Sequence, residues 1–267
     1  MCFLIWINST GIFIMNKTII FCTENKCPEP IFSSVMRDLS KKCESLNLPI
    51  ISVSHEPIDL GENICIGEHR RSWVMLYRQL LTGCSKAKTK YIGIAEHDCF
   101  YCEEHLAYIP PSDEKFFYNE NVWLVSYDKE KHPDKFGMYS RFWATRYALS
   151  QMVCDRKLYV DALEKRLALI KINKRSVKEI DHMTEPGHSK LSKRRLKLLK
   201  RANNGSSAYL RPLLPDFIEL EKAETFSTKI SNLDVRHGGN FTGPRRGRER
   251  RYKIKYWGKF ENLIQER

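Results

Sequence analysis

The sequence has no run of about 18 or more apolar residues, which excludes an ordinary transmembrane helix. Glycine (13) and proline (11) are too scarce among 267 residues for a collagen-like or low-complexity chain. Hydrophobic residues make up 42% of the chain, which is enough to bury a sizeable core and excludes a wholly disordered protein. The length suits one large domain, or one domain with an appendage.

A recognisable secretion signal is also lacking. The first 14 residues are apolar, but no basic segment precedes them and Asn8, Ser9 and Thr10 interrupt the run. Met15 stands directly before a strand-like stretch and is an alternative start, so residues 1–16 are expected to be an apolar extension. The nine cysteines are odd in number and irregularly spaced, which favours a reduced cytoplasmic protein.

The net charge of +13 is unevenly distributed along the chain. Residues 188–201 and 236–267 together hold 17 basic residues against 3 acidic ones, a net charge of +14. The remaining chain holds 28 basic against 29 acidic residues, a net charge of −1. Two basic stretches on a nearly neutral body favour an anionic partner, such as a nucleic acid, a phosphorylated ligand or an acidic surface. The alternative is a solvated helix face that serves only solubility.

Hydrophobic patterning predicts an α/β fold. Strands are expected at 17–23, 48–54, 91–95, 116–118 and 122–125, and helices at 31–46, 70–84 and 144–172, with a short basic helix at 189–202. Connections of this length favour a mostly parallel central sheet with flanking crossover helices. We expect residues 17–175 to form this ligand-binding domain and residues 176–267 to form a basic C-terminal region that completes the site.

Polar residues follow three of the expected strands. Thr23 and Glu24 end the first strand, His55 follows the second, and Glu96-His97-Asp98 follows the third. Open parallel sheets bind ligands at the carboxyl ends of their strands. Two carboxylates two residues apart in an extended chain point to the same side, which suits a hard cation that also binds phosphate oxygens. The alternative is a solvated acidic loop.

This arrangement resembles the A-type fold of nucleotide-sugar glycosyltransferases over residues 17–125. In that family a DxD-like motif at a strand end holds Mn²⁺ or Mg²⁺ on the diphosphate of the donor. The resemblance implies that Asp98 binds the metal, with Glu96 as a donor-site residue that departs from strict DxD. It also implies that the Thr23-Glu24-Asn25 end of the first strand contacts the nucleotide. Arg70 and Arg71, with Arg78 on the same expected helix, would contact the donor.

A late segment, Val235 to Gly243, combines a histidine with several glycines. Many members of this family bring a histidine from late in the chain to the metal, which makes His237 a candidate ligand. Gly238 and Gly239 would let backbone amides approach phosphate. Arg236, with Arg245 and Arg246, would offset the charge of the leaving diphosphate. The alternative is a glycine-rich surface loop.

A catalytic base is harder to assign. Inverting transfer needs a carboxylate that deprotonates the acceptor hydroxyl, whereas retaining transfer does not. Among Asp155, Asp181 and Glu185, the turn Thr184-Glu-Pro-Gly-His188 favours Glu185. A surface acid in a helix-terminating turn is the competing interpretation.

The spacing Cys99-Phe-Tyr-Cys102, with His97 and His105 nearby, raises a zinc site as an alternative. Structural zinc needs four ligands, and a single CxxC without a second pair is weak evidence for one.

The leading hypothesis is therefore a metal-dependent glycosyltransferase with a nucleotide-sugar donor. The basic segments, with the aromatic residues Tyr252, Tyr256, Trp257 and Phe260 among them, favour DNA with hydroxymethylated bases as the acceptor, as in phage DNA glycosyltransferases. A polysaccharide or lipid-linked acceptor at a membrane surface is the second alternative. A non-enzymatic nucleic-acid-binding protein is the third. A nucleotidyltransferase ranks last, because no glycine-rich phosphate loop lies near the N-terminus.

Overall fold

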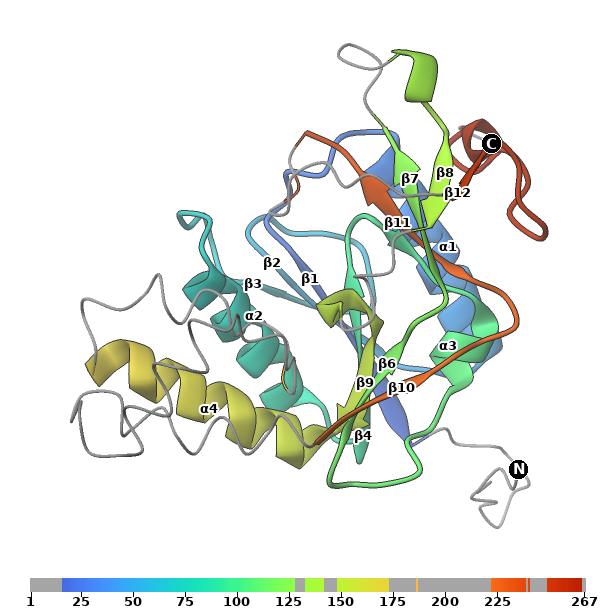
Figure 1. The fold of residues 1–267 in the computed structure, drawn as a ribbon. Coiled ribbons are helices and arrows are strands. Elements are labelled where there is room, and N and C mark those ends of the chain that lie inside the picture. The colour runs from blue at the N-terminus through green and yellow to red at the C-terminus, as the bar shows by residue number, and fades with distance from the viewer. Residues whose placement is uncertain are drawn as a thin grey trace, which may run out of the picture.

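The computed structural model describes residues 16–127, 133–141, 148–172, 186, 222–238, 240 and 249–265. These residues form two β-sheets with helices packed against them (Figure 1). The seven-stranded sheet contains β1 (Lys17–Thr23), β2 (Ile50–Ser54), β3 (Glu62–Cys65), β4 (Tyr91–Glu96), β6 (Phe116–Asn119), β9 (Met152–Asp155) and β10 (Ala223–Phe226), in the order β10-β6-β9-β4-β1-β2-β3.

The pairing in this sheet confirms the predicted α/β class. Strands β3, β2, β1 and β4 are mutually parallel, and β10 is parallel to β6. Only β9 runs antiparallel to its neighbours β4 and β6 among the described strands of this sheet. The expected strands at 17–23, 48–54, 91–95 and 116–118 all correspond to strands of this sheet.

Helices cover both faces of the seven-stranded sheet (Figure 1). Strand β1 shows why, because its side chains alternate: Ile19 and Phe21 join the core that contains α1 (Ile31–Ser45), whereas Ile20 and Cys22 join the core that contains α2 (Trp73–Lys86). The short α3 (Glu103–Ala107) lies on the side of α1, and α4 (Arg156–Ile172) packs against α2. No helix among the described residues has the length and apolar character that membrane crossing requires.

The second sheet packs on the side of α1 and contains residues from both halves of the chain. Its strands are β5 (Cys99–Phe100), β7 (Val122–Ser126), β8 (Tyr139–Arg141), β11 (Asn232–Arg236) and β12 (Glu249–Arg251), in the order β12-β8-β7-β11-β5. Short 3-10 turns occur at Pro133–Lys135, Leu149–Gln151 and Phe260–Asn262. Strand β5 begins directly after the Glu96-His97-Asp98 segment. Because β11 pairs with β5, this strand from late in the chain lies beside that segment. The division of the chain at residue 175 stays a prediction.

The second helix begins three residues later than predicted. It starts at Trp73, because the Ser72 side chain accepts a hydrogen bond from the backbone N–H of Met75 and so caps the helix. Arg70 and Arg71 therefore lie in the loop before α2, whereas Arg78 lies on the helix itself.

The expected helix at 144–172 is also only partly correct. Among its described residues, α4 begins at Arg156, and Met152–Asp155 form strand β9. Met152, Val153 and Cys154 are fully buried between β4 and β6, so the ladder on both sides outweighs the helical pattern of the surrounding sequence. The basic helix predicted at 189–202 lies outside the described residues.

Candidate active site

The strand order places the candidate site at a topological switch point. From β1 the chain passes through α1 to β2 on one side, whereas β4 adds to the opposite side of β1 after α2. Ligands of open α/β sheets bind outside the carboxyl ends of the strands at such a point. Cys22 of β1 pairs with Glu96 of β4, so the residues that follow both strands emerge side by side.

Asn25 connects the ends of β1 and β2. Its backbone N–H donates to Thr23 Oγ1 at 2.9 Å, and its side-chain Oδ1 accepts hydrogen bonds from the backbone N–H groups of His55 and Glu56, each at 3.0 Å. Asn25 has φ +60°, a left-handed conformation that asparagine tolerates better than most residues. This turn fixes Thr23 and Glu24 at the sheet edge.

Asp98 is the central anion of the site. It lies between β4 and β5, is buried, and its Oδ2 accepts a hydrogen bond from Asn240 Nδ2 at 2.6 Å. His237 Nε2 lies 3.5 Å from the same oxygen. Burial alone would raise the pKa of Asp98, but the contact with His237 and the proximity of the basic side chains of His97 and Arg236 lower it to about 2. The site therefore presents a carboxylate at neutral pH.

His237 follows β11 and is held by Asn240. The backbone N–H of His237 donates to Asn240 Oδ1 at 2.6 Å, while the amide of the same asparagine donates to Asp98. Backbone pairing adds to this, since the Val235 N–H donates to the Asp98 carbonyl at 2.8 Å. The structure thus brings together Asp98 and His237, the two residues predicted as metal ligands, across 139 positions of sequence.

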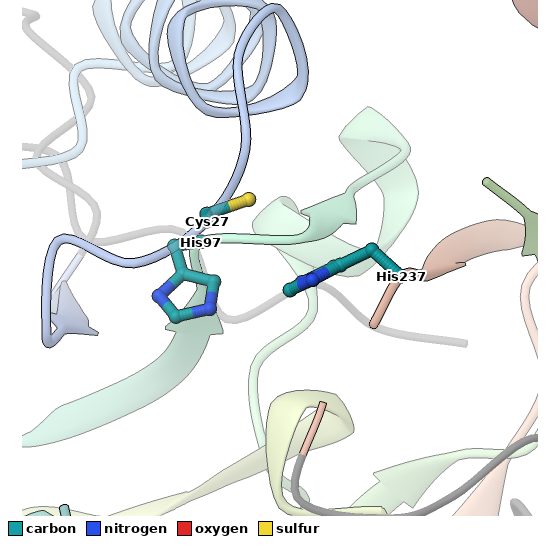
Figure 2. A group of neighbouring side chains, drawn as sticks. All are labelled: Cys27, His97 and His237. Atoms are coloured by element: carbon teal, nitrogen blue, oxygen red, sulfur yellow. The ribbon is translucent and has the colours of Figure 1, made fainter. Parts of the chain in front are cut away.

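His97 and Cys27 lie beside His237 (Figure 2). The ligand atoms of Cys27, His97 and His237 lie within 4.8 Å of one another, and all three residues are buried. His97 Nδ1 is 2.9 Å from Thr23 Oγ1. Burial lowers the pKa of His97. Burial also raises the pKa of Cys27, and the negative charges of Asp98, Glu29 and Glu24 raise it further. Without a ligand, both side chains are therefore neutral at pH 7.

A second group of possible ligands adjoins the first. Oxygens of Glu96 and Asp98 and the sulfur of Cys99 lie within 4.8 Å of one another. Asp98 and Cys99 are buried, whereas Glu96 is half-buried. The Glu96 backbone N–H donates to the hydroxyl of Tyr101 at 3.0 Å, which fixes the end of β4.

Charged pairs border the site. Arg71 Nε lies 3.0 Å from Glu24 Oε1, so two of the predicted donor-binding residues form an ion pair. Arg236, another predicted donor-binding residue, forms an ion pair with Asp234, and its Nη2 lies 2.8 Å from Oδ2. Arg70 is exposed.

Other candidates lie elsewhere. Glu185, Asp181, Gly239, Arg245 and Arg246 are outside the described residues. Asp155 is at the opposite end of the sheet, where it pairs with Tyr91, the first residue of β4. Its carboxylate accepts a hydrogen bond from the backbone N–H of Leu158 in the first turn of α4. Asp155 is thus a capping residue rather than a base of this site.

Within the described residues, the CxxC segment does not bring together the ligands of the alternative zinc site. Among the described residues, the groups of three or more potential ligands include neither Cys102 nor His105. The His105 ring is instead stacked between Tyr101 and Phe226, with ring centroids 5.3 and 5.8 Å away.

The aromatic residues of the basic C-terminal segment divide into two pairs. Tyr252 and Tyr256 are exposed at 55% and 54% of their surface. Trp257 and Phe260 are buried, and Trp257 Nε1 donates to the Ser231 carbonyl at 2.7 Å. The prediction that all four residues could stack on a ligand is therefore wrong for Trp257 and Phe260, which belong to the core.

Sequence reasoning missed Cys27 and Asn240 as members of the site. Cys27 follows the Thr23-Glu24-Asn25 end of β1, so its position at this sheet edge was an available signal. Asn240 has no such signal, because its role depends on how the chain turns after β11.

No protein-family model matches the sequence, and no curated protein matches it. Solved structures with a similar arrangement include S. aureus TarS (residues 1–349) in complex with UDP-GlcNAc, with 11% identity, a TM-score of 0.41, and coverage of 85% of this chain and 60% of that one. A glycosyltransferase involved in glycosylation of the major capsid of PBCV-1 gives 8% identity, a TM-score of 0.38, and coverage of 67% and 78%.

A Drosophila β1,4-galactosyltransferase 7 mutant in complex with manganese, UDP-Gal and xylobiose gives 8% identity, a TM-score of 0.36, and coverage of 59% and 62%. The chain thus spans about 60% of the length of the TarS fragment and of the galactosyltransferase. With TM-scores below 0.5, these similarities do not bear on the activity of this chain.

Proposed function

We propose that the protein is a metal-dependent glycosyltransferase that moves a sugar from a nucleotide sugar to a hydroxyl acceptor. The observation that carries this proposal is the meeting of Asp98 and His237 at the switch point of the sheet, with Oδ2 and Nε2 3.5 Å apart. A carboxylate that stays ionised beside an imidazole is a suitable ligand pair for a divalent cation such as Mn²⁺ or Mg²⁺. Such a cation acts as a Lewis acid on a diphosphate leaving group.

The surrounding residues suit a nucleotide-sugar donor. Thr23 and Glu24 lie at the end of β1, next to the proposed metal ligands, and Arg71 is held there by its ion pair with Glu24. Arg236 precedes His237 and supplies a guanidinium near the proposed position of the diphosphate. Glu96 borders the same position as a second carboxylate. Glu185 stays the proposed base that deprotonates the acceptor hydroxyl.

For the acceptor, we favour DNA with hydroxymethylated bases. Tyr252 and Tyr256 are exposed within a segment that also carries Arg250, Arg251, Lys253 and Lys255, and exposed rings among cations suit stacking on bases along a phosphate backbone. An anionic membrane surface that presents a polysaccharide or lipid-linked acceptor would use the same cations. A protein that only binds nucleic acid would use them without any donor turnover.

The direct test is a screen of nucleotide sugars with Mn²⁺ or Mg²⁺ that measures release of nucleoside diphosphate. We expect turnover of at least one donor, and a loss of about 100-fold or more in Asp98→Ala, because the metal loses its anionic ligand. Asp113→Ala is the matched control, since Asp113 is an exposed acid paired with Lys90. Absence of any donor binding or turnover, or wild-type activity in Asp98→Ala, would contradict the proposal.

A second assay addresses the acceptor. Hydroxymethylated DNA, unmodified DNA and anionic vesicles are each added with the active donor, and transfer is followed by mass spectrometry. DNA as acceptor requires product on hydroxymethylated DNA alone and binding that weakens steeply with salt. Salt-dependent DNA binding without donor turnover would instead favour the non-enzymatic alternative.

A further inference from the structure

The ligand group beside Asp98 differs in chemistry from a site for a hard cation. Mg²⁺ and Mn²⁺ favour carboxylate, carbonyl and water oxygens, whereas imidazole and thiolate favour zinc and related borderline ions. Here one sulfur and two imidazoles converge, from the β1–α1 loop (Cys27), the β4–β5 turn (His97) and the residue after β11 (His237). Three separate segments therefore deliver nitrogen and sulfur ligands to one buried point.

The spacing of these atoms is close to that of a metal centre. A point central to three atoms at most 4.8 Å apart is no more than about 2.8 Å from each of them, and bonds to zinc measure about 2.0–2.1 Å for imidazole nitrogen and 2.3 Å for thiolate sulfur. Side-chain shifts of less than about 1 Å would therefore bring all three atoms to bonding distance.

The partners of the two histidines suit metal ligands. Metal-binding histidines usually engage their second ring nitrogen in a hydrogen bond. Thr23 Oγ1 lies 2.9 Å from His97 Nδ1, so Nε2 is the nitrogen left for a metal. Figure 2 shows a ring nitrogen of His97 on the side that faces His237. Asn240 fixes the backbone of His237, and its amide holds Asp98 beside the same ring.

We propose that Cys27, His97 and His237 form a thiolate-containing metal centre that prefers Zn²⁺, or Co²⁺ as its substitute, over Mg²⁺ and Mn²⁺. Three protein ligands leave one tetrahedral position open, which is the pattern of catalytic rather than structural zinc sites. Asp98 lies beside this position through its contact with His237. The inference deepens the proposed function, on which it rests for the use of the centre in donor binding, but the metal preference follows from the three ligands alone.

The test is a titration of metal-free protein with Co²⁺, followed by absorption spectroscopy. The wild type should show sulfur-to-cobalt charge-transfer absorption together with the visible bands of four-coordinate Co²⁺, and stoichiometric Zn²⁺ should displace the cobalt while a large excess of Mg²⁺ should not. In Cys27→Ser the charge-transfer band should disappear, and Zn²⁺ affinity should fall by about 100-fold or more, since loss of even an outer partner of a metal ligand costs 10–100-fold.

Two further variants separate ligand loss from misfolding. Cys65→Ser removes an exposed thiol outside the group and should match the wild type in spectrum and affinity. His97→Gln should weaken binding but retain the charge-transfer band, because the thiolate stays in place. Circular dichroism of each metal-free variant shows whether it is folded. A folded wild type that binds Co²⁺ without the sulfur band, or a Cys27→Ser variant that retains wild-type Zn²⁺ affinity, would overturn the inference.

The same measurements distinguish the two proposals. If a nucleotide sugar is turned over with Mn²⁺ or Mg²⁺ while Co²⁺ shows no sulfur band, the thiolate centre is refuted and the glycosyltransferase proposal stands. If the sulfur band is present while no nucleotide sugar binds with any metal, the metal centre stands and the proposed function is refuted.

Discussion

The two ends of the seven-stranded sheet both bury ionisable side chains, but in different arrangements. At the amino end, Lys17 of β1 is fully buried with its Nζ donating to the Tyr108 carbonyl at 2.8 Å. His105 of α3, outside both ligand groups, is stacked between two aromatic rings. At the carboxyl end, Asp98, His97, His237 and Cys27 converge from distant segments. Burial alone therefore does not identify a site in this molecule; convergence of several potential ligands does.

The pKa values of the buried groups differ in the same way. Burial lowers the pKa of Lys17 to about 7 and, with the nearby charge of Lys17, lowers the pKa of His105 to about 3. Neither group takes part in an ion pair within the part of the chain that the structure describes. Asp98 has basic partners, and its pKa is lowered to about 2 despite burial. The surroundings of Lys17 and His105 thus disfavour charge, whereas the carboxyl end of the sheet keeps an anion.

Replacing one histidine inside the ligand group and one outside it should give the largest contrast. His237→Ala should lower kcat/KM by about 1,000-fold or more, because a bound cation supplies several kcal/mol of charge stabilisation in the transition state. His105→Phe should leave kcat/KM within about threefold of the wild type, because the ring packs between Tyr101 and Phe226 and phenylalanine can replace it there. Steady-state kinetics of nucleoside diphosphate release measure both values. Equal losses of kcat/KM in the two variants would mean that the histidine among the converging ligands matters no more for catalysis than the packed His105.

Lys17→Met should change how stability depends on pH. Below pH 7 the lysine is charged in both the folded and the unfolded chain, so the folded protein bears the full free-energy cost of burying this charge. Between pH 7 and 10.5 the folded lysine is neutral while the unfolded one still binds a proton. The cost of burial is therefore relieved as the pH rises through this range. The free energy of unfolding of the wild type should therefore rise relative to the variant by about 3 kcal/mol between pH 7 and 10.

Urea unfolding of both proteins at several pH values gives this difference. The comparison between variants cancels most of the contribution from other alkaline groups, among them Cys43, which lies near Lys17 and whose pKa is raised to about 12. Parallel curves for the two proteins would show that Lys17 is not buried as a neutral amine.

His105→Phe provides the acid counterpart. His105 is neutral in the folded chain down to about pH 3, whereas an unfolded histidine gains a proton near pH 6.5. The wild type should therefore lose stability relative to the variant as pH falls from 6.5, by about 2 kcal/mol at pH 4.5. Thermal or urea unfolding across this range measures the difference. A constant offset between the two proteins would contradict the assignment.

The sequence predicted the sheet more completely than the site. Strands β1, β2 and β4 and helix α1 follow from short apolar runs and a regular helical stripe, which depend on local residues. Strand β9 was missed because its four residues are a strand only between β4 and β6, a nonlocal condition. The pairing of Asp98 with His237 was predicted through the family resemblance, whereas Cys27 and Asn240 depend on how two loops fold back.

The smallest predicted effect concerns the ion pair at the edge of the site. Arg71 and Glu24 are 29% and 14% exposed, and their pair lies where the nucleotide is proposed to bind. Arg71→Ala should raise the KM of the donor by about tenfold with little change in kcat, because a binding contact is lost equally from ground state and transition state. Lys86→Ala is the matched control: its pair with Glu62 is of similar length, at 2.9 Å, but is about half exposed and lies at the far end of α2. That variant should keep its KM and change stability by less than about 1 kcal/mol. If both variants raised the KM of the donor alike, the effect would come from the general surface charge. The Arg71–Glu24 pair would then be no more important for donor binding than the distant Lys86–Glu62 pair.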